Sequence, residues 1–404
     1  SVGTGTMVSD GLTFINADFS STSFTMSRTA IGARNFLGNN IAYPAQGRTG
    51  DNCLLGTKVM IPIDGEVREG VGLLGSPPFE IPRSVQRDSV FDEYKHGDEQ
   101  RRRLAAKNRH NLITMAIHLF VRWVFFSASL LIALVAGTLL EGYGEVAVQT
   151  ALIAELGLSV AYFTLVGRAT TGFRDLKPRF CSVYDRHFWR HERYWKVPST
   201  AFIRLFNGTP VKGVIWRLLG VRVGDRLFDD GCGIVERTLV SVGNDCTLNA
   251  GSVLQGHSLE DGTFKSDHIT LGDDCTLGIN AFVHYGVRIG DGAVLDPDSF
   301  LMKGEEVRPH AQWRGNPATE RTAGSSTNTA AVTLPVTPLT ESKPSPAPRT
   351  GARPQRPGQR GTHPQRPAGP AHRRRAEPSP DGRGRHRWSE PRANIRADRE
   401  RDTS

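Results

Sequence analysis

Mostly aliphatic residues recur at every sixth position in two separate parts of the chain, with one longer gap between Leu254 and Leu271. They are Ile31, Leu37, Tyr43, Thr49, Leu55, Ile61 and Val67 in the first part, and Val242, Leu248, Leu254, Leu271, Leu277, Val283, Ile289, Leu295 and Leu301 in the second. A period of six fits neither an α-helix nor a single alternating strand. A fixed hexapeptide period predicts a β-helix, in which three hexapeptides form one triangular coil and the aliphatic residue points inward.

Small or β-branched residues occupy a second fixed position, four residues after the aliphatic one. In the second part they are Cys246, Ser252, Cys275, Ala281, Val287, Ala293 and Ser299. Cys53 holds a similar place in the first part, two residues before an aliphatic position. Free cysteine behaves as a small apolar residue, so these cysteines suit the interior of a coil and a reducing compartment.

A strongly apolar region separates the two repeat blocks. Residues 119–140 contain a single charge, Arg122, and are long enough to cross a ~30 Å hydrocarbon core. A second apolar run, residues 146–166, follows a short acidic turn and is interrupted by Gln149 and Glu155. Basic flanks place both ends at the cytoplasmic face, and Arg122 and Glu155 are candidates for an intramembrane pair. The alternative is a buried hairpin in a soluble core.

The segment after the second apolar run interleaves aromatic and basic residues. It suits either the headgroup region of a membrane or an ordinary connector packed on the β-helix. Asp185, His187 and His191 lie close in sequence, but "HFWRH" lacks the glutamate of the HExxH zinc motif, so no metal site is expected.

Charge and composition change sharply at the end of the chain. The formal net charge is +9, and residues 341–404 alone hold 16 Lys and Arg against 7 Asp and Glu. Eleven of the 24 prolines also lie after residue 340. We therefore expect residues 322–404 to form a disordered basic tail. The rest of the chain has no net charge, so we expect no specific nucleic-acid partner. The chain begins at Ser1, so we expect a fragment of a longer protein.

The hexapeptide repeats resemble the left-handed parallel β-helix of hexapeptide-repeat acyltransferases. The segment "RGNPA" (residues 314–318) is similar to the one that closes their β-helix, and both repeat blocks end in Gly, then Ser or Asn, then Pro. Four longer stretches are similar to the C-terminal region of poly-lysine-synthetase-like nonribosomal peptide synthetases: Ser9–Phe24, Gly47–Gly65, Arg68–Ser84 and Phe282–Glu305. In that family, membrane helices alternate with soluble acyltransferase-like modules.

The resemblance implies a mainly β fold with two duplicated β-helix modules joined by a transmembrane hairpin. The predicted boundaries are a first β-helix at 1–83, a charged connector at 84–111, membrane helices at 112–141 and 145–167, an interfacial connector at 168–219, a second β-helix at 220–321 and the tail at 322–404. It also implies a multi-pass membrane protein whose modules face the cytoplasm.

The function that the resemblance implies is acyl transfer from a phosphopantetheine thioester to an amine, within a nonribosomal peptide synthetase. The donor would be acyl-coenzyme A or a carrier-protein thioester, with no covalently bound cofactor and no metal. Partners would be the carrier and adenylation domains of the same synthetase, the bilayer, and a second β-helix supplied by a homo-oligomer or by the other module. The alternatives are a non-catalytic docking scaffold and a stand-alone coenzyme A-dependent O- or N-acetyltransferase.

Such a transfer needs a general base, and two histidines are candidates. The spacing from Leu254 to Leu271 is not a multiple of six, so a loop that begins near His257 must leave the coil. His284 follows Val283 at an exposed coil corner where Gly is usual. His268 and His310 are weaker candidates, and Asp267 or Glu260 could orient an imidazole. By resemblance, the donor arm would be lined by Trp313, Arg314, Gly315, Asn316, Pro317 and Ala318.

Overall fold

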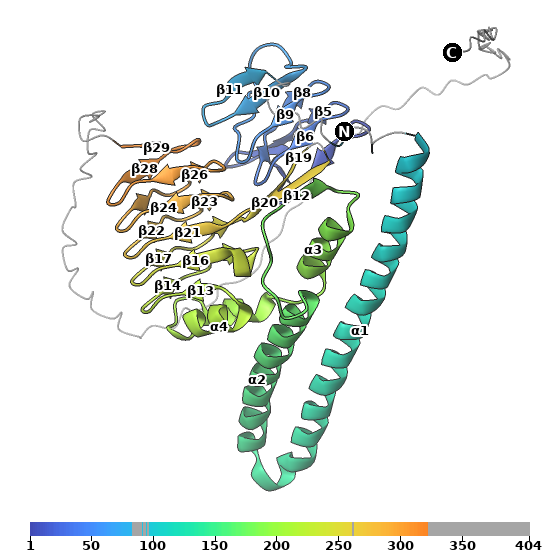
Figure 1. Ribbon diagram of the computed structural model, residues 1–404, viewed down its shortest axis with the longest axis vertical. Coiled ribbons are helices and arrows are strands. Elements are labelled where there is room, and N and C mark those ends of the chain that lie inside the picture. The colour runs from blue at the N-terminus through green and yellow to red at the C-terminus, as the bar shows by residue number, and fades with distance from the viewer. Residues whose placement is uncertain (83–90, 92–93, 95–96, 261, 322–404) are drawn as a thin grey trace, which may run out of the picture. The chain divides into compact units, whose positions relative to one another are not determined.

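The computed structural model describes residues 1–82, 91, 94, 97–260 and 262–321, and the predicted tail at 322–404 lies outside these residues. Two β-rich parts are separated along the chain by helices (Figure 1). We call residues 1–82 the N-terminal block and residues 222–320 the C-terminal block. The predicted connector 84–111 falls partly outside the described residues, and its described part from Gly97 onward is helical.

The C-terminal block is built from three parallel sheets of short strands, which form the faces of a coil. The first sheet contains β13 (Arg222–Val223), β16 (Val240–Val242), β21 (Ile269–Leu271), β24 (Arg288–Ile289) and β27 (Glu306–Val307). The second contains β14 (Phe228–Asp229), β17 (Thr247–Leu248), β22 (Thr276–Leu277), β25 (Val294–Leu295), β28 (Gln312–Arg314) and β29 (Thr319–Glu320), of which β29 is antiparallel. The third contains β15 (Gly233–Ile234), β18 (Val253–Leu254), β23 (Phe282–Val283) and β26 (Phe300–Leu301).

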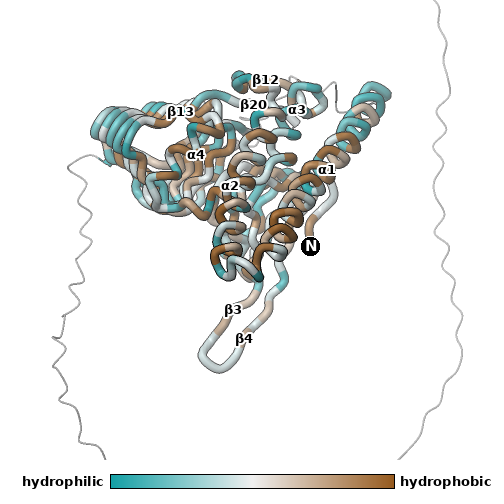
Figure 2. Tube along the Cα trace, turned by 90° about the horizontal axis from the view of Figure 1, so that it is seen from below, coloured by the Kyte–Doolittle hydropathy of each residue, from teal (hydrophilic) through white to brown (hydrophobic). Residues whose placement is uncertain are grey.

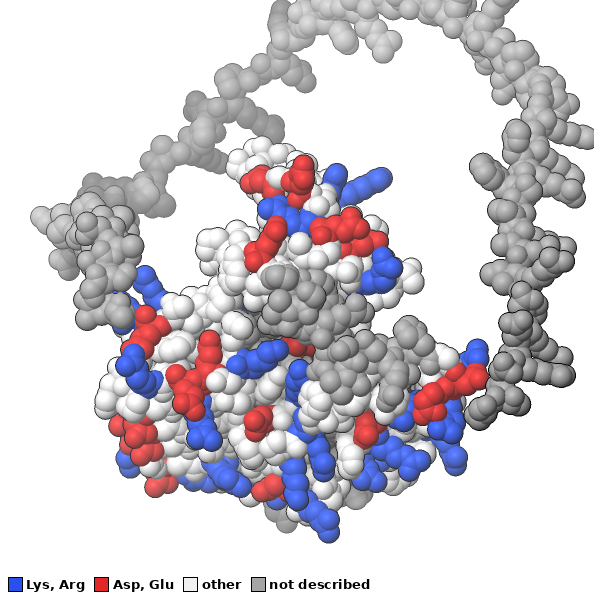
Figure 3. Space-filling model, turned by 45° about the horizontal axis from the view of Figure 1, so that its top comes forward, with Lys and Arg blue, Asp and Glu red and all other residues white. Residues whose placement is uncertain are grey.

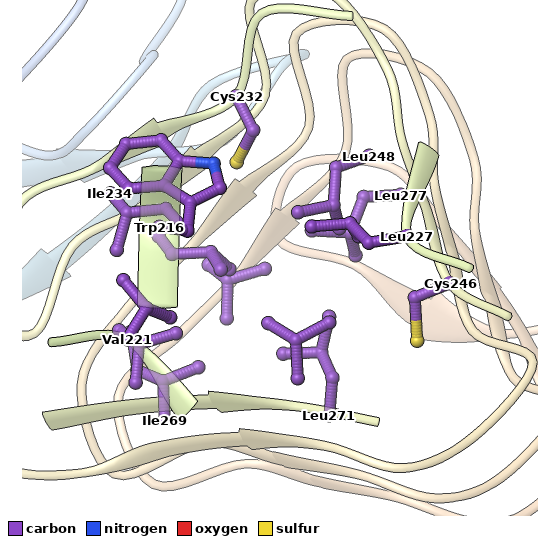
Figure 4. Close-up of a cluster of buried hydrophobic side chains, with 14 of the residues drawn as sticks. Trp216, Val221, Leu227, Cys232, Ile234, Cys246, Leu248, Ile269, Leu271 and Leu277 are labelled. Carbon is purple, nitrogen blue, oxygen red and sulfur yellow. The ribbon is translucent and has the colours of Figure 1, made fainter. Parts of the chain in front are cut away.

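The aliphatic positions of the second part fill the interior of this coil, as the six-residue period predicts. All nine of them are buried, and Leu277 and Leu248 stack in neighbouring coils within one apolar cluster (Figure 4). The small residues of the second fixed position are buried too, and the cysteines among them are free. The parallel coil is thus confirmed, while its left-handed winding stays a prediction.

The N-terminal block contains the same kind of short parallel pairs. Its strands are β1 (Met7–Val8), β2 (Thr13–Phe14), β3 (Ala17–Phe19), β4 (Phe24–Met26), β5 (Ala30–Ile31), β6 (Phe36–Leu37), β7 (Ala42–Tyr43), β8 (Arg48–Thr49), β9 (Leu54–Leu55), β10 (Val71–Leu74) and β11 (Phe79–Pro82). Six of its seven predicted positions are buried. Val67 is half exposed, so the prediction that it points inward is wrong; it lies in the stretch between β9 and β10 that forms no strand.

Both blocks end in an antiparallel hairpin at the segments that the sequence singled out as alike. The first is β10–β11 and the second is β28–β29. Each turn carries a cis X–Pro bond, Ser76–Pro77 and Asn316–Pro317. The Ser76 amide donates a hydrogen bond of 3.0 Å to the Asn316 carbonyl, so the two turns touch.

Helices α1 (Gly97–Tyr143) and α2 (Glu145–Thr170) pack against each other and form a hairpin. Among the described residues, these two helices are long and apolar enough to cross a membrane, judged by length and composition. The suggested Arg122–Glu155 pair is wrong. The guanidinium of Arg122 lies 5.3 Å from the centroid of the Phe163 ring, and Glu155 Oε1 accepts a hydrogen bond from Ser129 Oγ at 2.8 Å.

The connecting segment after α2 packs on the C-terminal block. It contains β12 (Arg179–Ser182), α3 (Arg186–Lys196), a 3-10 helix η3 (Ala201–Phe206) and α4 (Val211–Leu219). The side chains of Phe188, Trp189 and Tyr194 on α3 are buried, so much of the aromatic character serves this packing. The inner face of α4 covers the first coil, where Trp216 meets Val221 and Ile234 (Figure 4).

Candidate active site

A cleft with a volume of about 780 Å³ lies between the two blocks. Strands β1, β6 and β9 of the N-terminal block contribute one wall, and the third sheet of the C-terminal block contributes the other. Helices α3, η3 and α4 also border it. Both candidate histidines, His257 and His284, line this cleft.

His257 is positioned by an insertion in the coil. The residues after Leu254 form a β-hairpin, β19 (His257–Glu260) and β20 (Thr263–Ser266), and β12 pairs with β20 as a third strand. The predicted loop is therefore an ordered sheet that projects from the coil. The His257 ring lies against Trp195 of α3, with ring centroids 4.4 Å apart, which leaves the imidazole 13% exposed.

A buried carboxylate, Glu236, contacts the His257 imidazole. Glu236 Oε1 lies 2.9 Å from His257 Nδ1, but the geometry does not meet the criteria of a hydrogen bond. The same oxygen accepts a hydrogen bond from Trp195 Nε1 at 2.8 Å. His191 Nε2 lies 3.2 Å from the same oxygen. Burial alone raises the pKa of Glu236, but the His257 and His191 imidazoles outweigh burial and hold the pKa well below its usual range. Glu236 is therefore an anion at neutral pH.

Sequence reasoning missed Glu236, although a second break in the period marks it. Ile234 pairs with Leu254 in the third sheet, yet the next inward position is Val242, eight residues on. The short 3-10 helix η4 (Arg237–Leu239) occupies the extra length, and Glu236 stands at its start. This break occurs at the same corner as the hairpin insertion one coil later. A Cβ on Gly256 would lie 3.0 Å from the Cβ of Glu236, a tight contact that favours glycine beside this carboxylate.

His284 is buried, with 7% of its surface exposed, so the prediction of an exposed corner residue is wrong. The hairpin β19–β20 folds over this corner, where Ser258 Oγ lies 3.4 Å from Tyr285 Oη. Burial is the main cause that lowers the pKa of His284 to about 3, and the neighbouring His257 and Lys303 side chains act in the same direction. His284 is therefore neutral at physiological pH, and its Nδ1 accepts a hydrogen bond from the Tyr285 amide at 3.2 Å.

The N-terminal block reaches the residues beside His257 directly. Asn39 Nδ2 lies 3.1 Å from Gln255 Oε1, and Gln255 Nε2 donates to the His257 carbonyl at 3.2 Å. At the rim, Lys303 Nζ pairs with Glu260 at 3.2 Å. Asp267 is exposed, and the carboxylate that contacts the His257 imidazole, at 2.9 Å, is that of Glu236.

The closing segment contributes two of its six predicted donor-binding residues to the cleft. Asn316 and Pro317 line it, whereas Trp313, Arg314, Gly315 and Ala318 are not among the lining residues. Asn316 Nδ2 donates to the Lys58 carbonyl at 2.7 Å, which fixes the turn against the N-terminal block. Trp313 and Ala318 instead pack on the apolar core of the coil.

The remaining candidates lie elsewhere or serve structural roles. His268 and His310 are exposed and do not line the cleft. Asp185 caps α3 by accepting from the His187 amide at 2.6 Å. Among the described residues there is no group of three or more His, Cys, Asp and Glu side chains arranged to hold a metal. Positive and negative side chains are intermingled on the face drawn in Figure 3, in keeping with the neutral charge before the tail.

Comparison with known proteins agrees with the hexapeptide repeat of the C-terminal block. A family profile described as the hexapeptide repeat of succinyl-transferase matches residues 268–296, which include β21 to β25 and His284. Over 313 residues, 73% of the chain is 26% identical to Delta-poly-L-ornithine synthetase from Acinetobacter baumannii (strain AB307-0294). The predicted resemblance to poly-amino-acid synthetases with hexapeptide-repeat modules is confirmed. The chain spans 22% of the length of that relative.

Two solved acetyltransferases are also similar to parts of the chain. Serine acetyltransferase from Neisseria gonorrhoeae is 21% identical, with a TM-score of 0.25, and the match covers 41% of this chain and 54% of that one. A hexapeptide-repeat-containing acetyltransferase from Vibrio cholerae O1 biovar eltor, solved with acetyl coenzyme A, is 18% identical. Its TM-score is 0.25, and the match covers 43% of this chain and 88% of that one.

Proposed function

We propose that the chain is an acyltransferase module that moves an acyl or aminoacyl group from a phosphopantetheine thioester to an amine. The observation that carries this proposal is the His257–Glu236 contact of 2.9 Å inside a cleft of about 780 Å³. An imidazole beside a buried carboxylate is suited to remove a proton from a nucleophile. The relative named a poly-ornithine synthetase supports amide-bond formation as the reaction class.

The proton can be followed through the reaction with the residues at hand. With Glu236 beside Nδ1, the nitrogen of His257 left for the acceptor is Nε2. The neutral amine attacks the thioester carbonyl and passes a proton to Nε2 as the C–N bond forms. Glu236 stabilises the resulting imidazolium by its charge. The C–S bond then breaks, and the departing thiolate takes the proton from His257, which restores the neutral base.

Other cleft residues have supporting roles in this proposal. His284 stays neutral and presents a polar ring beside His257, so it can orient the acceptor without adding charge. Asn316 and Pro317 border the path of the extended pantetheine arm. The arm could belong to coenzyme A or to a carrier domain of the same synthetase, because both present the same thioester chemistry.

The two blocks together form the cleft, so we propose that the N-terminal block supplies the second wall within one chain. The similar closing hairpins β10–β11 and β28–β29 support the view that the blocks are duplicated modules. The α1–α2 hairpin would tether both modules to the membrane, with the soluble parts facing the cytoplasm as the basic flanks predict.

The test is product formation from defined donors by the purified full chain in detergent. Acyl-coenzyme A and a carrier-bound aminoacyl thioester are offered separately with a diamino acid acceptor, and thiol release and amide product are measured. We expect His257→Ala to reduce product formation by about 10²–10⁴-fold, whereas His268→Ala at the exposed base of the same hairpin retains full activity. If His257→Ala and His284→Ala both form product at the wild-type rate, the block is a scaffold and the proposal fails.

A further inference from the structure

The segment η3–α4 presents a row of exposed apolar side chains on its outer face. Leu205 is 70% exposed, and Val211, Val214 and Leu218 are 46%, 49% and 50% exposed. The spacing 211, 214 and 218 puts the three α4 residues on one helix face. The opposite face is fully packed, because Ile215, Trp216 and Leu219 are buried against the first coil. The helix is thus amphipathic, with its second apolar side uncovered.

The location of this face suggests what covers it. Both η3 and α4 contact α2, one of the two helices that are apolar enough to cross a membrane. In Figure 1, α4 lies next to β13 at the end of the coil from which the hairpin extends. Figure 2, drawn from that side, shows α4 next to α2. Phe173 lies three residues after the end of α2 and is another exposed apolar side chain, with 59% of its surface accessible.

Basic side chains accompany the exposed apolar row. Arg204 on η3, which also lines the cleft, and Arg217 on α4 are exposed, as are Arg174 and Lys177 just after α2. Arg217 pairs with Asp225 at 3.1 Å and donates to the Val223 carbonyl at 2.9 Å, so the charge argument rests on Arg204, Arg174 and Lys177. A helix with one buried face, an outer apolar row and flanking cations matches an in-plane helix at the boundary between headgroups and acyl chains. Anionic headgroups would attract the cations.

We infer that η3–α4 docks onto the surface of the bilayer that the α1–α2 hairpin crosses. The inference rests on the membrane hairpin of the proposed function and goes beyond it, because it fixes the soluble module against the lipid. The aromatic helix α3 does not take this role, since its Phe188, Trp189 and Tyr194 side chains are buried.

The docking also places the cleft at the membrane surface. Lys212 and Trp216, on the inner side of α4, line the cleft. Lys212 Nζ is paired with buried Asp229 at 3.0 Å, and Trp216 Nε1 donates to the same carboxylate at 2.6 Å. One short helix therefore contacts lipid on its outer side and borders the candidate active site on its inner side. An acceptor or product that stays at the membrane surface would lie close to His257.

The test uses nitroxide labels on the full chain reconstituted into vesicles of phosphatidylcholine and phosphatidylglycerol. Single cysteines are introduced by Val214→Cys on α4, Leu131→Cys on α1 and Ile279→Cys on an exposed turn of the C-terminal block. A sample without an added cysteine corrects for labelling of the native thiols. Collisions with oxygen, which concentrates in lipid, are compared with collisions with a water-soluble nickel chelate.

We expect the oxygen-to-nickel ratio to be highest at Leu131, intermediate at Val214 and lowest at Ile279. A ratio at Val214 equal to that at Ile279, with Leu131 still in lipid, overturns the docking of α4 and leaves the hairpin intact. Protection of Val214 from both reagents means that protein covers the face and overturns the lipid assignment. A water-exposed Leu131 overturns the hairpin, and the docking with it.

Discussion

At the scale of single residues, one oxygen of Glu236 faces three side chains, His257, His191 and Trp195. The carboxylate is fully buried and remains charged because two imidazoles surround it. Burying such an anion costs desolvation free energy. Once buried, it stabilises a positive charge on a neighbour much better than solvent does. We therefore assign Glu236 a positioning role behind His257.

Replacement of Glu236 by Gln keeps the size of the side chain and removes its charge. We expect kcat for acyl transfer to fall by about 10–100-fold, as for other supporting partners, while KM for the acceptor stays within about twofold. Steady-state kinetics measure both. Glu306→Gln, on an exposed strand position of the same block, is the matched control and should behave as wild type. A change confined to KM would contradict the positioning role.

The buried His284 imidazole makes stability depend on pH. Its pKa is about 3 in the folded chain, against the ordinary value of 6.5 that applies to the unfolded chain, so the unfolded state binds the proton more readily. The stabilisation is complete above the unfolded pKa and is lost as pH falls toward the folded pKa. Between pH 7 and pH 5, the free energy of unfolding of the wild type should fall by about 2 kcal/mol more than that of His284→Gln. Denaturant unfolding in detergent measures both, and equal pH slopes would contradict the assignment.

At the scale of elements, the six-residue period fixes which side chains fill the coil. Leu277 is fully buried, and Ile279, two residues later on the adjoining turn, is 53% exposed. Leu277→Ala should lower the free energy of unfolding by about 2–5 kcal/mol, because it leaves a cavity among stacked leucines. Ile279→Ala should change it by less than about 0.5 kcal/mol. Thermal or denaturant unfolding tests the pair, and equal losses would contradict the coil register.

The sequence predicted the elements that local repetition encodes. The inward positions, the small corner residues and the interruption at His257 all follow from spacing within a few coils. The burial of His284 could not be predicted, because it depends on the hairpin β19–β20 folding over the next coil. Glu236 was missed for a similar reason: its partners His191 and Trp195 come from α3, about 40 residues earlier. Contacts between distant segments leave no periodic signal.

At the scale of the whole molecule, contacts between the two blocks hold the cleft together. Lys58 of the N-terminal block forms an ion pair with Asp298 and donates to the Asn280 carbonyl at 2.8 Å. Its own carbonyl accepts from Asn316. These contacts and the Asn39–Gln255 hydrogen bond join walls that the sequence separates by about 200 residues.

Loss of the Lys58 side chain should loosen the N-terminal block. We expect Lys58→Ala to raise the rate of limited proteolysis within residues 1–82 by about tenfold, which corresponds to roughly 1.4 kcal/mol of lost docking energy. The kcat/KM for acyl transfer should fall as the cleft opens. Arg48→Ala removes an exposed cation from the same block and should leave both unchanged. Unchanged proteolysis of Lys58→Ala would mean that the blocks do not depend on this contact.

In the proposed function, His257 acts as the base for acyl transfer in a cleft built by both blocks. The most direct measurement is the single-turnover rate constant at saturating donor and acceptor, compared between wild type and His257→Ala. Saturation removes differences in binding, so the rate constant reports the chemical step alone. We expect a fall of at least about 100-fold, with the fold and the donor affinity preserved. An unchanged single-turnover rate constant would contradict it.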